Sequence, residues 1–146
     1  MASVSIYVLD ELELSLADLA RLPDDVTDGM LEEGAKVIVR EMKKTAPRDT
    51  GQLSASIAAG KVKRGRDGKR IYVYPSGTRK KTAAYRSKTG ARPVRNAEVG
   101  FILEYGAPRR GLPARQWVWK ASEAAADEAV GQAKQVYEKY LKKLNL

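Results

Sequence analysis

The sequence predicts an α+β fold: a small antiparallel sheet packed by one helix from the N-terminal half and one long C-terminal helix, with an extended basic loop. Apolar residues recur at helical spacing over 25–45 and again over 114–143. Between these two ranges, apolar and polar residues alternate with the period of two that is typical of strands. At 146 residues the chain is long enough to bury a real core, and we expect one domain, 1–146.

Two short elements are expected before the first long helix. A strand over 3–9 is predicted because its apolar residues fall at every second position: Val4, Ile6 and Val8. A short helix that ends at Pro23 is suggested by the spacing of Leu16, Leu19 and Leu22.

The helix over 25–45 is predicted by an apolar stripe that comprises Leu31, Ala35, Ile38 and Met42. Asp24 or Asp25 is the expected N-cap, and the acidic residues that follow suit the positive end of the helix dipole. Lys43 and Lys44 suit its negative end. Pro47 disfavours the α region for the residue before it, so the helix is expected to stop there.

A sharp turn is expected after this helix, at Asp49-Thr50-Gly51. Short polar side chains bond to nearby backbone, and glycine adopts positive φ without a steric penalty. Beyond the turn, Leu53, Ala55 and Ile57 alternate with polar residues, as in a strand with one wet face. The plain interpretation of this stretch is a corner between helix and strand that carries no chemistry.

Three strands are predicted for the sheet, over 54–63, 69–75 and 96–103, and the strand over 3–9 is a candidate for its edge. The first two are joined by residues 64–69, which contain two glycines and an Asp-Gly pair, a strong hairpin signal. The third is predicted by the alternation of Ala97, Val99, Phe101 and Leu103 with their neighbours.

The segment 76–95 is predicted to be an extended basic loop. We expect it to form an arm that contacts a neighbouring subunit or DNA through six basic side chains: Arg79, Lys80, Lys81, Arg86, Lys88 and Arg92. Such an arm buries too little apolar surface to become ordered by itself. A solvated loop without a partner is the alternative.

The last helix is predicted over 114–143, with Pro113 suited to its first turn. The apolar stripe of this helix is rich in alanine, which permits close approach to another helix or to a sheet. Trp117 is expected to pack beneath the start of the helix, against the sheet or the helix over 25–45. Trp119 is expected to be less buried.

Charge is distributed unevenly along the chain, whose net charge is +9. Residues 1–35 hold nine acidic side chains and one basic side chain, whereas residues 61–95 hold thirteen basic and one acidic. A chain polarised in this way can attract a polyanion, or the opposite end of a neighbouring copy.

The composition argues against most enzymes. The chain has no cysteine and no histidine, which removes thiolate nucleophiles, the commonest general base and the commonest metal ligands. Asp49-Thr50-Gly51 superficially resembles the aspartic-protease triplet, but that site needs two copies in apolar strand surroundings. We therefore expect no catalytic, cofactor-binding or metal-binding residues.

Neither a membrane span nor a signal peptide is expected, because no run of eighteen apolar residues occurs and Met1 is not followed by a basic-then-apolar segment.

Two parts of the chain resemble the tail-component family of tailed bacteriophages, whose members are also called neck or tail-completion proteins. The first is the run from Ala46-Pro47 through Asp49-Thr50-Gly51 and Leu53 to Ser56-Ile57, after an amphipathic helix. The second comprises Val99–Gly106, similar to the family's closing strand, and Pro113–Ala121, similar to its entry into the last helix. Three positions depart from the family pattern: Ala107 stands where Thr is usual, Gln116 replaces a Pro, and Trp117 replaces a Phe. The residues that carry the resemblance as a structural motif are Pro47, Asp49, Thr50, Gly51, Leu53, Glu104, Gly106 and Trp117.

The resemblance implies a structural virion protein of the neck, assembled in the host cytoplasm, that forms a ring and joins head to tail around the DNA channel. The implied partners are other copies of the chain, in a hexamer or dodecamer with the hexamer favoured, and the adjacent head-closure or connector and tail-terminator or tail-tube proteins. Genomic DNA in the channel is a further candidate partner. Neither a cofactor nor a membrane is implied.

The basic segment also allows a second function, that of a stand-alone nucleic-acid-binding protein. The sequence contains no helix-turn-helix, zinc-finger or recognition-helix pattern, and its basic residues lie on predicted loops and strands. Assembly separates the two functions, because a neck protein forms rings or joins heads to tails, whereas a binding protein shifts DNA as a monomer or dimer.

Overall fold

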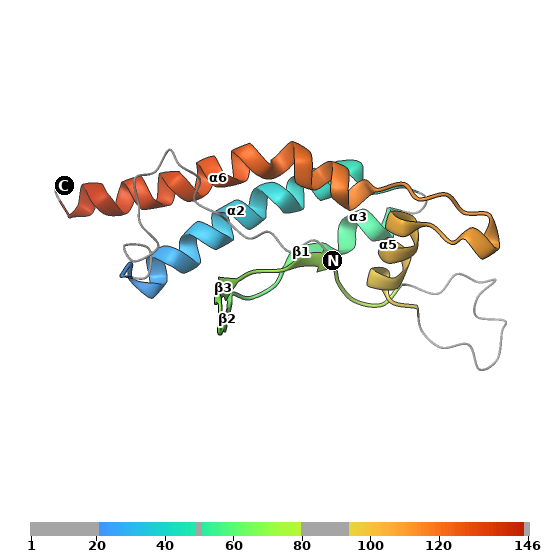
Figure 1. Ribbon diagram of the computed structural model, residues 1–146, viewed down its shortest axis with the longest axis horizontal. Coiled ribbons are helices and arrows are strands. Elements are labelled where there is room, and N and C mark those ends of the chain that lie inside the picture. The colour runs from blue at the N-terminus through green and yellow to red at the C-terminus, as the bar shows by residue number, and fades with distance from the viewer. Residues whose placement is uncertain (1–20, 49–50, 80–93, 145–146) are drawn as a thin grey trace.

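Two long antiparallel helices, α2 (Asp24–Thr45) and α6 (Trp117–Lys143), form the frame of the protein. In the computed structural model, which describes residues 21–48, 51–79 and 94–144, these helices lie side by side, and the strands and shorter helices lie along one side of the pair (Figure 1). The fold is α+β, as predicted. Among the described residues, no helix combines the length and the apolar character that a membrane crossing requires.

Helix α2 ends as predicted and begins differently. Pro23, rather than Asp24 or Asp25, occupies the N-cap position, and its carbonyl accepts hydrogen bonds from the backbone N–H groups of Val26 and Thr27, both at 3.1 Å. The two aspartates lie in the first turn instead, where they suit the helix dipole without capping it. At the other end, Ala46 leaves the helix with ψ 127°, because Pro47 follows it.

Helix α6 packs on α2 through small side chains. Its buried residues recur at every fourth position: Trp117, Ala121, Ala125, Ala129 and Ala133. Their methyl groups let α2 approach closely, as the alanine content predicts. The helix begins at Trp117 rather than at 114, so the prediction that Pro113 lies in its first turn is wrong. Gln116 precedes it in the left-handed region, with φ 47°.

The main core lies between these two helices and the strands. It comprises thirteen buried residues, among which Trp117 and Met42 are the largest fully buried side chains. Trp117 is 2% exposed and Trp119 is 54% exposed, which confirms the contrast predicted from the sequence. A smaller cluster around Val26, Met30 and Ala133 extends the core toward the N-terminus of α2.

The corner after α2 leads into a helix, not a strand. Gly51 adopts φ 77°, as predicted for the turn, but the next residues form the short helix α3 (Gln52–Ser56). Leu53 and Ile57 are both buried whereas Ala55 is exposed. Leu53 and Ile57 are four residues apart, so the same sequence fits helical spacing as well as alternation. The Ser54 hydroxyl donates to the Lys43 carbonyl at 3.1 Å and fastens α3 to the end of α2.

Two short antiparallel ribbons replace the single predicted sheet. Strand β1 (Ile57–Ala59) pairs with β4 (Val73–Pro75), and β2 (Lys63–Gly65) pairs with β3 (Gly68–Arg70). The hairpin predicted over 64–69 is confirmed, since Gly65 lies opposite Gly68. The strands predicted over 54–63 and 69–75 are each only partly strand, because each is divided between the two ribbons.

The strand predicted over 96–103 is wrong: this segment is helix α5 (Asn96–Tyr105). The residues that α5 buries are Asn96, Gly100 and Glu104, a set spaced by four. The alternating apolar residues misled the strand prediction, because Phe101 is 61% exposed and the buried residues are polar or lack a side chain.

Some expected features lie outside the described residues. They are the strand over 3–9, most of the short helix before Pro23, the Asp49-Thr50 part of the turn, and residues 80–93 of the basic segment. The two ends of that segment are described and pair with each other. The Arg79 N–H donates to the Val94 carbonyl at 2.7 Å, and Thr78 forms an antiparallel bridge with Arg95.

Candidate functional site

A buried carboxylate organises the junction between α5 and α6. Glu104, near the end of α5, accepts a hydrogen bond from the backbone N–H of Val118 at 2.7 Å and another from that of Trp119 at 3.2 Å. These are donors of the first turn of α6, which have no partner within the helix. The first turn of α6 has no acidic residue of its own. Glu104 therefore caps this helix from a distance and places negative charge at the positive end of its dipole.

The buried side chain of Trp117 also holds this junction together. Its indole Nε1–H donates to the Gly100 carbonyl at 3.0 Å, and its own carbonyl accepts from the Thr45 hydroxyl at 2.9 Å. A Cβ at Gly100 would lie 3.2 Å from the indole, a tight contact, so the glycine helps α5 to lie close to Trp117. The end of α2, the middle of α5 and the start of α6 are thus joined at one residue.

The loop between α5 and α6 depends on Gly106. This glycine has φ 77°, and a Cβ there would lie 2.7 Å from the Ala114 nitrogen and 2.8 Å from the Leu112 carbonyl oxygen. The chain then turns through the 3-10 helix η1 (Pro108–Arg110) and returns in a bridge between Ala107 and Leu112. The loop projects beyond the helices at one end of the molecule (Figure 1).

Four aromatic side chains lie exposed beside this junction. We call Tyr74, Phe101, Tyr105 and Trp119 the aromatic surface. Phe101, Tyr105 and Trp119 are 61%, 59% and 54% exposed, and the rings of the first two lie 4.7 Å apart between centroids. The four line a largely apolar hollow of about 240 Å³ with Trp117 and Glu104 in its wall. The sequence interpretation missed this surface, although the four-residue spacing of Phe101 and Tyr105 could have indicated a shared helix face.

A second hollow, of about 350 Å³, is lined by three arginines: Arg48, Arg79 and Arg115. Pro47, Gly51 and Leu53 of the corner motif line it too. Arg79 is the one predicted contact residue in the described part of the chain; Lys80, Lys81, Arg86, Lys88 and Arg92 lie outside it. The structure therefore brings the base of the basic segment to the corner motif.

The resemblance motif converges around the α5–α6 junction. Leu53 and Trp117 lie against Gly100, Glu104 caps α6, and Gly106 begins the loop that leads back to α6. Pro47 and Gly51 lie at the corner before α3. Asp49 and Thr50 lie outside the described residues. The described members have evident structural roles as helix cap, turn and core.

Away from this junction, the β2–β3 ribbon is attached to the start of α2 through Lys69. Its Nζ lies 2.7 Å from an oxygen of Asp28 and 2.9 Å from one of Asp24. The pKa of Asp24 is lowered mainly by the hydrogen bond from Lys69 and, after it, by the positive charge of Lys69. The pKa of Lys69 is raised mainly by its hydrogen bonds to Asp28 and Asp24. The Lys69 side chain is only 16% exposed, so this contact is better shielded from solvent than the other ion pairs of the ribbon.

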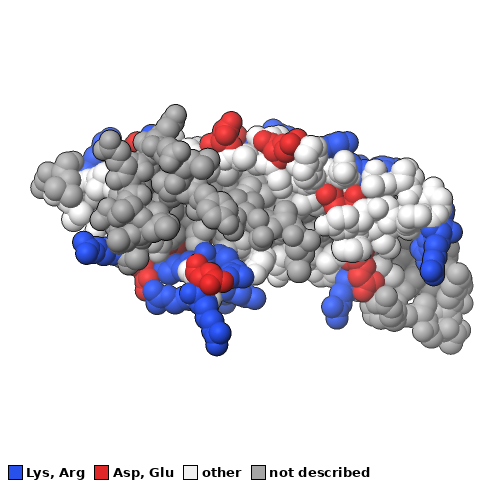
Figure 2. All heavy atoms as spheres, viewed as in Figure 1, with Lys and Arg blue, Asp and Glu red and all other residues white. Residues whose placement is uncertain are grey.

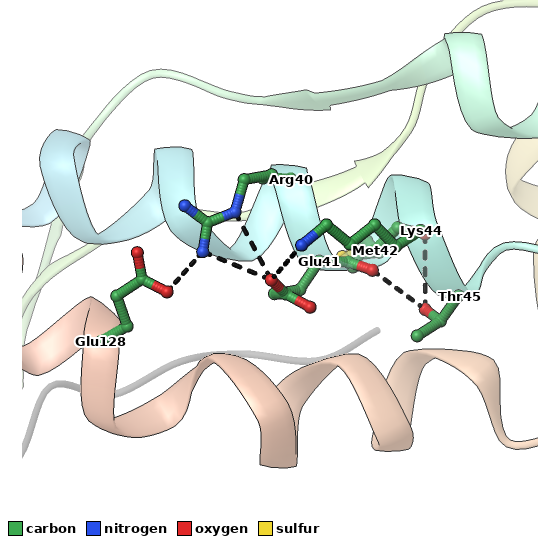
Figure 3. A network of polar contacts seen from close by, with 6 residues as sticks. All are labelled: Arg40, Glu41, Met42, Lys44, Thr45 and Glu128. Atoms are coloured by element: carbon green, nitrogen blue, oxygen red, sulfur yellow. Dashed lines mark hydrogen bonds and ion pairs between the residues drawn. The ribbon is translucent and has the colours of Figure 1, made fainter.

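A polar network also links the two long helices on the surface. Arg40 of α2 pairs both with its neighbour Glu41 on the same helix and with Glu128 on α6 (Figure 3). Lys44 of α2 donates to Glu41 at 3.1 Å. Arg40 and Glu128 are each 47% exposed, and exposed ion pairs contribute little to stability. The network joins the two helices at the surface and has no evident chemistry. Among the described residues, no cluster of acidic side chains could hold a metal ion.

Comparison with known protein families identifies a related family. A family model described as "HK97-gp10_like: Bacteriophage HK97-gp10, putative tail-component" matches residues 10–92. The match covers α2, the corner and both ribbons, and ends before α5. Comparison with curated proteins and with solved structures gave no match. Because the family model covers more than half of the chain, the protein belongs to the HK97-gp10-like family and is a structural, tail-associated protein of a bacteriophage virion.

Proposed function

We propose that the protein forms a homo-oligomeric ring in the phage neck, a hexamer rather than a dodecamer, and joins head to tail around the DNA channel. The observation that carries this proposal is the aromatic surface. Tryptophan and tyrosine are enriched among the residues that dominate binding energy at protein interfaces. Here they are exposed on a junction that Glu104 and Trp117 hold in place, so little entropy is lost when a partner covers them.

The occupant we propose for the aromatic surface is a neighbouring copy of the chain. Subunits of a ring associate through two unlike surfaces, and a rotation that closes gives a ring rather than a fibre. The loop before α6 and the start of α6 also carry exposed basic side chains: Arg109, Arg110 and Lys120. Residues 1–20 carry four acidic side chains and no basic side chain, and several leucines lie among them. This segment of the neighbouring copy has the apolar and acidic character that complements the surface.

The structure changes one part of the electrostatic argument. The acidic charge of residues 1–35 is not all available to a neighbour, because Asp24 and Asp28 pair with Lys69 of the same chain and Glu33 pairs with Lys36. The complementary charge that remains is concentrated in the first twenty residues. The proposal therefore relies on that segment rather than on helix α2.

The other proposed partners are the adjacent rings of the neck and the DNA in the channel. The arm over 76–95 would contact a neighbouring subunit or the DNA, and we favour the subunit. The antiparallel pairing at its base supports this proposal, because both ends of the arm leave the body together beside Arg48 and Arg115. Such a base suits an arm that reaches across to a neighbour.

Stand-alone nucleic-acid binding is the second candidate function, favoured by the isoelectric point of about 9.8. It does not account for the aromatic surface, since sequence-independent binding of duplex DNA relies on contacts to phosphates.

Head–tail joining in vitro tests the proposed function. Heads and tails from a phage that lacks this protein are mixed with the purified chain, and infectious particles are counted. The wild-type protein should restore joining, and the double variant Phe101→Ser/Trp119→Ser should fail while melting at the wild-type temperature. Leu144→Ser removes an exposed apolar side chain at the opposite end of α6 and should restore joining fully. Joining by the double variant at the wild-type level would contradict the role of the aromatic surface.

A further inference from the structure

The β2–β3 ribbon divides its basic side chains between two faces. Its register places Arg64 opposite Lys69 on one face and Lys63 opposite Arg70 on the other. Like charges directly opposite each other in an antiparallel pair are destabilising, so each cation pair needs a counter-charge.

The inner face obtains that counter-charge from the protein itself. Lys69 pairs with Asp24 and Asp28, and Arg64 lies 3.6 Å from Asp24. The apolar neighbours on this face, Val62 and Ile71, pack into the core. The inner face is therefore neutralised and fixed to α2, which makes the ribbon a rigid attachment rather than a free hairpin.

The outer face, which we define as Lys61, Lys63, Arg70 and Tyr72, has much less counter-charge. Within the described ranges, neither Lys61 nor Lys63 has an acidic partner, and Arg70 has only Asp67, at 3.9 Å with a side chain 91% exposed. Tyr72 lies among these cations: the Lys63 ammonium is 5.9 Å from the centre of its ring, and Arg70 donates to its hydroxyl at 3.4 Å. The face combines three cations with an aromatic ring and is presented away from the core.

The ribbon is also placed where a large partner could reach it. It projects from the side of the helix pair (Figure 1), and basic side chains gather over it in the space-filling view (Figure 2). Cations at alternate positions of a strand lie roughly 6.6 Å apart, from about 3.3 Å per residue. A two-stranded ribbon fits the major groove of duplex DNA.

We infer that the outer face of the β2–β3 ribbon binds the phosphate backbone of duplex DNA. This inference names a DNA-contacting element for the proposed ring, and it rests on that function for the identity of the DNA as the packaged genome. Duplex DNA fits better than the acidic surface of a protein, because interface cores between proteins are depleted of lysine. The tip of the ribbon offers glycines, Gly65 and Gly68, and no apolar anchor.

The experiment measures binding of the full chain to a short duplex DNA of mixed sequence by fluorescence anisotropy at several salt concentrations. Each phosphate contact contributes about 0.9 to the slope of log affinity against log salt. The double variant Lys61→Ser/Lys63→Ser should therefore flatten the slope by up to about 1.8. Lys61→Arg/Lys63→Arg keeps both charges and should keep the slope. The matched control Lys142→Ser/Lys143→Ser removes the same charge from the end of α6 and should leave the slope unchanged.

Three results would overturn the inference. The first is a slope unchanged in the Lys61→Ser/Lys63→Ser variant, and the second is an equal flattening in the Lys142→Ser/Lys143→Ser control, which would reflect net charge alone. The third is loss of assembly with unaltered DNA binding, which would assign the outer face to a subunit contact. The mass of each sample is measured in parallel. An intact ring with an unchanged slope contradicts this inference alone, whereas a flattened slope without a ring contradicts the proposed ring alone.

Discussion

The carboxylate of Glu104 accepts a hydrogen bond from the backbone N–H of Val118 at 2.7 Å, fourteen residues further along the chain. This bond satisfies a donor that the first turn of α6 leaves without a partner, and it joins α5 to α6 beneath the exposed aromatic residues. The positions of Phe101, Tyr105 and Trp119 therefore depend on this junction, which Glu104 and Trp117 hold together.

Glu104→Ala should lower the free energy of unfolding by about 1–3 kcal/mol, because two backbone donors lose their acceptor. Glu104→Gln keeps one acceptor oxygen and should cost less than the alanine variant. Urea denaturation at neutral pH measures both differences. Equal stability of Glu104→Ala and wild type would show that solvent replaces the carboxylate without cost.

Gly106→Ala should be among the most damaging single-methyl additions in the chain. The new Cβ would lie 2.7 Å from backbone at a residue with φ 77°, so both the contact and the conformation oppose it. We expect a loss of at least about 2 kcal/mol. Gly131→Ala adds the same methyl to open space on α6 and should stabilise by about 0.5–1 kcal/mol. Thermal melting compares the two, and a Gly106→Ala variant at least as stable as Gly131→Ala would contradict the turn assignment.

The two tryptophans at the start of α6 should separate stability from assembly. Trp117→Ala removes a fully buried ring and should cost about 3–5 kcal/mol. Trp119→Ala removes a side chain that is 54% exposed, so the subunit should keep its melting temperature and lose assembly. Calorimetry and sedimentation measure the two properties. If Trp119→Ala assembles normally, Trp119 does not lie in the interface.

The attachment of the ribbon to α2 should depend on pH in a defined direction. The pKa of Asp24 is lowered by Lys69, so the stabilisation is present above the ordinary value of 3.8 and is lost as pH falls through the lowered pKa. The pKa of Lys69 is raised, so its contribution is present below 10.5 and is lost as pH rises through the raised pKa. Asp24→Asn should therefore be less stable than wild type at pH 7, and the difference should shrink below pH 3.8. A difference that is the same at both pH values would mean that the pair does not couple to folding.

The parts of the fold that the sequence predicted correctly are those set by local rules. Helix α2, its end before Pro47, the turn at Gly51 and the hairpin at Gly65–Gly68 each follow from periodicity, proline or glycine. The burial of Trp117 rather than Trp119 follows from helical spacing, because Trp117 lies four residues before Ala121 on the buried alanine stripe. The family resemblance is confirmed for the corner and the helix before it, which lie within the matched residues 10–92. The resemblance of Val99–Gly106 and Pro113–Ala121 lies outside that match and stays a prediction.

The errors arose where tertiary contacts decide between two local patterns. Residues 96–103 alternate like a strand, but their helix is selected by the contacts of Gly100 with Trp117 and of Glu104 with the start of α6. Leu53 and Ile57 satisfy both periods, and the packing of α3 against α2, α5 and β4 favours the helix. Neither pattern predicts the aromatic surface. A strand over 96–103 would bury Phe101 with the alternating apolar residues, whereas the helix α5 leaves it exposed.

The native mass of the purified full-length chain tests the central claim most directly. A ring predicts one dominant species at six times the 16.1 kDa subunit mass, with twelve times as the alternative closed form, and a central hole in particle images. The Phe101→Ser/Trp119→Ser variant should remain at the subunit mass. A wild-type protein that stays monomeric or dimeric at micromolar concentrations, with or without duplex DNA, would contradict the proposed ring.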